Sequence, residues 1–88
     1  MLHRNAFSLS ARDDPFTVIV EPWAEEFQVD AGSTCKIVAL NPDNPPSFDV
    51  ELYRGALVVT ILESESTFEF WRGNMMEFSM PIAIPTML

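Results

Sequence analysis

The stretch "FDVELYRGALVVTIL", residues 48–62, decides the fold class. Its first part places Phe48, Val50 and Leu52 on one face and alternates them with polar residues, which is the pattern of a half-buried β-strand. After a break at Arg54-Gly55, residues 56–62 are apolar at almost every position, which predicts a central strand covered on both faces. Neither part shows the spacing of an amphipathic helix. The stretch therefore predicts an all-β domain.

The rest of the chain repeats this strand character between turn residues. Further segments rich in valine, isoleucine, phenylalanine and threonine lie at 16–21, 25–29, 34–40, 66–71 and 75–80. Together they predict about seven short antiparallel strands, whose spacing is typical of a β-sandwich or, as the alternative, a small barrel. The apolar segment 81–88 contains Pro81 and Pro85 and fits an edge strand, because proline has no N–H to offer another chain.

The charge distribution places a domain boundary near the N-terminus. Residues 1–12 carry Arg4 and Arg12 and no acid, whereas all thirteen acids follow from Asp13 onward. This break predicts a flexible tail over 1–14 and a single folded domain over 15–88.

Composition excludes several classes of function. A net charge of −8 argues against binding nucleic acid or an anionic membrane, since both require a basic surface. The one cysteine, Cys35, excludes an internal disulfide, and no Cys/His cluster is present for a zinc or redox site. The chain has no apolar run of the length of a membrane span and no signal-peptide pattern, so we expect a cytoplasmic protein without a cofactor.

The stretch "FQVDAGSTCKIVALNPDNPPSFDVEL", residues 27–52, has a glycine turn, a strand, an Asn/Asp loop and a strand that starts after a proline. This order resembles the cupredoxin family, and the resemblance implies a Greek-key β-sandwich. In that family a histidine after the proline binds copper, and a late loop adds a cysteine, a second histidine and often a methionine. Here Ser47 follows Pro46, and loop 71–78 offers only Met75 and Met76, so a type 1 copper centre cannot form. The turn "VDAGS" also looks like part of a cupin, but the metal-binding histidines of cupins are missing.

Catalytic machinery is not evident in the sequence. His3 is the only histidine and lies in the predicted tail, which excludes Ser-His and Cys-His nucleophiles, so we expect no enzyme and assign no catalytic residue. Weak metal candidates are Asp49 and Glu51, which share a strand face and are expected near Glu69 and Glu77, although such a row is also typical of a solvated face. His3 is a third candidate, because a free amino group, two amides and the imidazole could wrap Cu(II) or Ni(II).

The apolar C-terminal part predicts an interface. On so small a protein, segment 81–88 is too hydrophobic to lie wholly in water, which indicates self-association or a protein partner. The expected function is a non-enzymatic binding or assembly module, with an interface at Trp71, Met75, Met76, Ile82 and Ile84. The alternative is a small-ligand or metal-ion site on loop 41–47. Trp23 and Trp71 both lie at strand ends, where either a core or a surface position fits the sequence.

Overall fold

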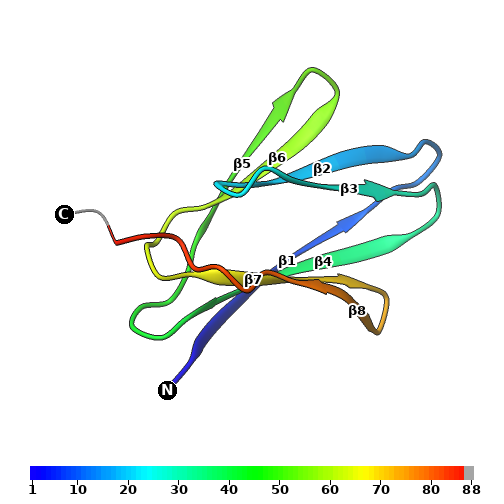
Figure 1. Cartoon of the computed structure of the whole chain (residues 1–88). Coiled ribbons are helices and arrows are strands. Elements are labelled where there is room, and N and C mark those ends of the chain that lie inside the picture. The colour runs from blue at the N-terminus through cyan, green and yellow to red at the C-terminus, as the bar shows by residue number, and fades with distance from the viewer. Residues whose placement is uncertain (87–88) are drawn as a thin grey trace.

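The fold is a β-sandwich, described for residues 1–86 by a computed structural model (Figure 1). Sheet A has the strand order β1-β4-β7-β8 and sheet B the order β3-β2-β6-β5, and the sheets do not close into a barrel. This confirms the predicted all-β sandwich. No helix in the described part of the chain is long and apolar enough to cross a membrane. Residues 1–86 contain eight strands, which are β1 (His3–Ser10), β2 (Phe16–Glu21), β3 (Glu25–Val29), β4 (Thr34–Asn41), β5 (Phe48–Tyr53), β6 (Ala56–Ile61), β7 (Thr67–Arg72) and β8 (Met75–Ser79).

Strand β1 is the element that the sequence analysis missed. Residues 3–10 pair with β4 along their whole length, with Phe7 opposite Ile37 and Leu9 opposite Cys35. The predicted flexible tail is therefore wrong for these residues. The composition break near Asp13 marks a change of sheet and not the start of the fold. Leu9 lies in the core and Phe7 packs against it, so β1 belongs to the folded domain. The strand with which β1 pairs, β4, is distant in the sequence.

One strand pair also departs from the predicted antiparallel arrangement. Strands β2 and β6 are parallel, in a register that runs from Thr17 opposite Ala56 to Glu21 opposite Thr60. The chain changes sheet between β1 and β2, β3 and β4, β4 and β5, and β6 and β7. Because β2 and β6 are thus joined through another sheet and not by a hairpin, their directions are free to agree.

The core lies between the sheets and is richest in aromatic side chains where β3 crosses β7 and β8. Phe27 stacks on Phe70 with ring centroids 4.0 Å apart and meets Phe78 at 5.6 Å. Phe68 is fully buried and contacts the half-buried Trp23 at 4.9 Å. A fully buried aromatic such as Phe68 or Phe70 contributes about 1.5–3 kcal/mol, so this cluster helps to hold the two sheets together. Trp23 belongs to the core margin.

The C-terminal segment is held in place without being a strand. Ile84 donates its N–H to the Ser66 carbonyl at 3.0 Å and accepts the Glu65 N–H at 2.7 Å. The predicted edge strand is therefore wrong over 81–86, while residues 87–88 lie outside the described part. Pro81 and Pro85 lack the N–H groups that a continuous ladder with β7 requires.

An open edge at strand β5 as the candidate site

The inner face of sheet B continues beyond the cover that sheet A provides. The register aligns Val18 of β2, Leu57 of β6 and Leu52 of β5 in one row across the sheet. Val18 is fully buried and Leu57 half-buried, but Leu52 is 79% exposed; in the next row, Val50 is 38% exposed. The sequence predicted this face of β5 as buried, and that prediction is wrong for Val50 and Leu52.

The geometry of the β5–β6 hairpin explains this exposure. At the start of β5, Phe48 contacts Phe7 of β1 at 5.8 Å, and the Asn5 side chain donates to the Pro46 carbonyl at 3.1 Å. At the far end, Arg54 and Gly55 have φ values of 49° and 80°, as in the tight type I′ turn that joins two strands. Figure 1 shows the tip of this hairpin pointing away from the strands of sheet A. Strand β5 is therefore anchored at one end and uncovered at the other.

The backbone of β5 is open at the same residues. A two-residue type I′ turn makes its flanking residues, Tyr53 and Ala56, a hydrogen-bonded pair, and such pairs alternate along an antiparallel ladder. The Leu62 N–H donates to the Ser47 carbonyl at 3.3 Å, which agrees with this alternation. It follows that the N–H and C=O groups of Val50 and Leu52 point to the free edge.

The other edge strands each carry an irregularity or a side-chain contact to the backbone. On β1, the Asn5 side chain accepts the Ala6 N–H at 3.0 Å and is tied to the neighbouring loop. The β7–β8 pair has a register shift, and Arg72 binds both Glu77 of β8 at 2.6 Å and the Gln28 carbonyl of β3 at 2.9 Å. Strand β5, by contrast, pairs in regular register over 48–53 and contains no proline, lysine or bulge.

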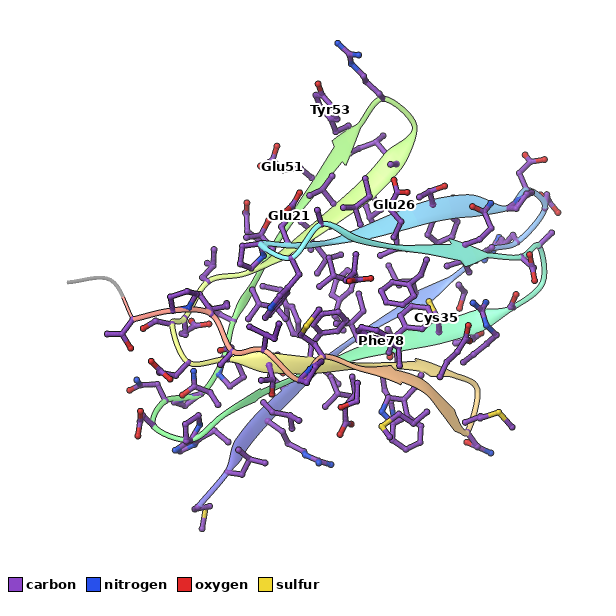
Figure 2. All side chains as sticks on the ribbon, in the orientation of Figure 1. Glu21, Glu26, Cys35, Glu51, Tyr53 and Phe78 are labelled. Carbon is purple, nitrogen blue, oxygen red and sulfur yellow. The ribbon has the colours of Figure 1, made fainter. Side chains whose placement is uncertain are left out.

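The outer face of β5 is acidic. Asp49 and Glu51 point to this face, where the register adds Glu21 to the row of Asp49 and Glu26 to the row of Glu51. Glu21, Glu26 and Glu51 are labelled in Figure 2. None of these four carboxylates forms an ion pair with any residue in the described part of the chain. The nearby base, Arg54, lies over the Tyr53 ring at 5.3 Å from its centroid.

The predicted acidic row does not form. Glu69 and Glu77 lie on sheet A, where Glu69 accepts the Trp71 indole N–H at 2.9 Å and Glu77 binds Arg72. They are therefore not neighbours of Asp49 and Glu51. His3 is the first residue of β1 and pairs with Asn41. Within residues 1–86, no group of three or more histidine, cysteine, aspartate or glutamate side chains is placed to hold a metal ion.

Loop 41–47 uses its polar atoms internally. The buried Asn41 side chain donates to the Ser64 carbonyl at 2.9 Å and to the Ser66 hydroxyl at 2.8 Å, and its oxygen accepts the N–H groups of Asp43 and Asn44, each at 2.9 Å. No pocket opens on the part of the chain that the structure describes. The loop therefore has the contacts of a structural connection.

Glu63 fixes the other end of this loop. Its carboxylate accepts the Ser47 N–H at 2.7 Å and also the Ser47 hydroxyl. Burial acts to raise the pKa of Glu63, but the bonds from Ser47, with the backbone N–H groups of Glu63 and Leu62, outweigh it and hold the pKa below its ordinary value.

The structure separates the five residues predicted as an interface. Met75 is 72% exposed, Met76 is exposed beside it, and Trp71 is half-buried with the Lys36 ammonium 5.2 Å from its ring centroid. Beyond the other end of β8, Ile82 is 68% exposed and its carbonyl accepts the Trp23 indole N–H at 2.7 Å. Ile84, the fifth, packs against the core.

Sequence reasoning missed the edge position of β5, because the strand alternates like any half-buried strand.

Comparison of the chain with protein-family models, with curated proteins and with solved structures finds no significant match. Function therefore has to be inferred from the geometry of the chain.

Proposed function

We propose that the chain is a non-enzymatic binding module that takes an extended polypeptide segment as an additional strand on the free edge of β5. The observation that carries the proposal is the 79% exposure of Leu52 on the same sheet face as the fully buried Val18. An added strand would bond to the outward backbone groups of Val50 and Leu52 and cover their side chains at the same time.

The available contacts suit a weak and reversible partner. Each backbone hydrogen bond to Val50 or Leu52 contributes about 1 kcal/mol net. Covering the exposed parts of the two side chains adds about 2–4 kcal/mol. The segment loses several kcal/mol of translational and conformational freedom on binding, which offsets much of this gain.

Selection of peptides from a random displayed library, with the tag-free protein as bait, tests the proposal. Leu52→Asn and Met75→Asn form a matched pair, because these side chains are 79% and 72% exposed in different parts of the molecule. We expect selected peptides to bind the wild type and Met75→Asn equally, and Leu52→Asn about tenfold more weakly. Their amide chemical-shift changes should centre on residues 48–53.

The opposite pattern would refute the proposal. Peptides that tolerate Leu52→Asn but lose affinity with Met75→Asn would assign binding to the β7–β8 hairpin, where the sequence predicted an interface. Thermal unfolding of both variants controls for loss of fold, and both are expected to remain folded because the substituted side chains are exposed.

A further inference from the structure

We infer that the segment bound by β5 alternates basic and apolar residues. The inference rests on the proposed function and names the chemistry of its partner. It follows from the two faces of β5, because each residue of an added strand lies directly opposite a β5 residue on the same face.

The inner face of the edge selects apolar side chains. Val50 and Leu52 point to this side, with the half-buried Leu57 behind Leu52 in the next strand. The side chain of a residue opposite Val50 or Leu52 would contact that apolar side chain. It would also cover part of the inner face of sheet B that sheet A leaves exposed. Valine, isoleucine or leucine at alternate positions of the segment matches this surface.

The outer face selects positive charge. Residues opposite Asp49 and Glu51 would lie next to carboxylates that have no ion-pair partner in the described structure, with Glu21 and Glu26 further along the same rows. Opposite charges directly across a strand pair attract, and like charges repel. Lysine or arginine at the remaining alternate positions of the segment therefore completes the match.

A second copy of the chain fits this edge poorly. Antiparallel pairing of two β5 strands about Asp49, Val50 or Glu51 places carboxylates of the two copies opposite each other. Pairing about Leu52 avoids this contact but overlaps only residues 51–53. Each copy also has a net charge of −8, which adds to the repulsion. A basic partner meets none of these obstacles.

Short synthetic peptides that differ in one property each provide the test. The main probe alternates lysine and valine; the others alternate threonine with valine, alternate glutamate with valine, or contain the lysines and valines of the main probe in two separate blocks. Binding is measured by amide chemical shifts of the wild type, of the double variant Asp49→Asn/Glu51→Gln and of Val50→Pro. In Val50→Pro the lost N–H is one that β6 does not use.

Methylation of the peptide backbone tests strand addition without altering the protein. In antiparallel pairing, the valines opposite Val50 and Leu52 direct their N–H groups to β5, and the lysines direct theirs away; in parallel pairing the two sets exchange roles. We therefore expect N-methylation of one set, the valines or the lysines, to abolish binding and N-methylation of the other set to preserve it, and the set that abolishes binding identifies the direction of pairing.

The expected result is binding of the lysine–valine peptide with shifts over 48–53, and about tenfold weaker binding of the threonine–valine peptide. The double variant should remove this preference, and Val50→Pro should remove binding. Equal binding of the lysine and threonine peptides, both blocked by Val50→Pro, would overturn the basic partner and leave the proposed function intact.

Two results would overturn the proposed function as well. One is equal binding of the alternating and block peptides to the wild type and to a folded Val50→Pro, which would show charge attraction without strand addition. The other is unchanged binding of both the valine-methylated and the lysine-methylated peptides, because an added strand of either direction needs the N–H groups of one of the two sets. Finally, a dimer of the free protein in native mass spectrometry that Val50→Pro dissociates would assign the edge to a second copy and overturn the basic partner.

Discussion

Replacing Asn41 with alanine tests whether loop 41–47 is a structural connection. The substitution removes two donated and two accepted hydrogen bonds of a fully buried side chain. Asp43 and Asn44 are exposed, so water can satisfy their N–H groups, but Ser66 is fully buried and loses a partner. Lost hydrogen bonds cost about 1 kcal/mol each and an unsatisfied buried group about 1–3 kcal/mol, so we expect the free energy of unfolding to fall by about 3 kcal/mol.

Urea unfolding followed by tryptophan fluorescence measures this loss, and Asn44→Ala is the matched control. The Asn44 side chain is exposed, so its removal should change the free energy of unfolding by less than about 0.5 kcal/mol. In a thermal melt, the Asn41→Ala loss corresponds to a fall in Tm of roughly 15 °C for a domain of this size. A loss similar to that of Asn44→Ala would refute the structural role of Asn41 and return the loop as a candidate ligand site.

Three further predictions concern the C-terminal segment, loop 41–47 and the core. Ile84→Asp should lower the free energy of unfolding by at least about 2 kcal/mol because Ile84 packs on the core, whereas Ile82→Asp should be near neutral; equal losses in urea unfolding would contradict this. Because the pKa of Glu63 is lowered from 4.5 in the folded state, its stabilising contribution is present above that pH and is lost as the pH falls through the folded-state pKa. Glu63→Gln should therefore be less stable than the wild type at neutral pH and equal to it in stronger acid; a pH-independent difference would argue against the Ser47 contacts. Burial raises the pKa of the Cys35 thiol above 9.0, so a thiol reagent should label Cys35 only as fast as the protein opens, and rapid labelling of the folded protein would show that the site is accessible.

Local patterns were sufficient to locate strands with their own alternation. Strands β2, β3 and β5 begin and end where the sequence predicted, because Pro22, Gly32 and Gly55 interrupt the pattern at the turns. Strand β1 escaped prediction because its partner, β4, is distant in the sequence. Its exposed residues resemble a tail until the contacts of Phe7 with Ile37 and with Phe48 are known.

The candidate site depends on information that one strand does not contain. Alternation identified which side chains of β5 share a face, but exposure depends on how far sheet A extends, which places Leu52 in water although Val18 in the same row is buried. The prediction that Glu69 and Glu77 lie near Asp49 and Glu51 failed for a related reason. Glu51 and Glu69 have similar local patterns but lie in different sheets, and only the strand order separates them.

Cross-strand nuclear Overhauser contacts between the lysine–valine peptide and the labelled protein test strand addition at β5 most directly. We predict contacts from peptide Hα and valine protons to the amide and side-chain protons of Val50 and Leu52, because their backbone groups face the free edge. Contacts to Met75, Met76 or Ile82 in place of β5 would contradict the proposal and assign binding to the apolar surface that the sequence predicted.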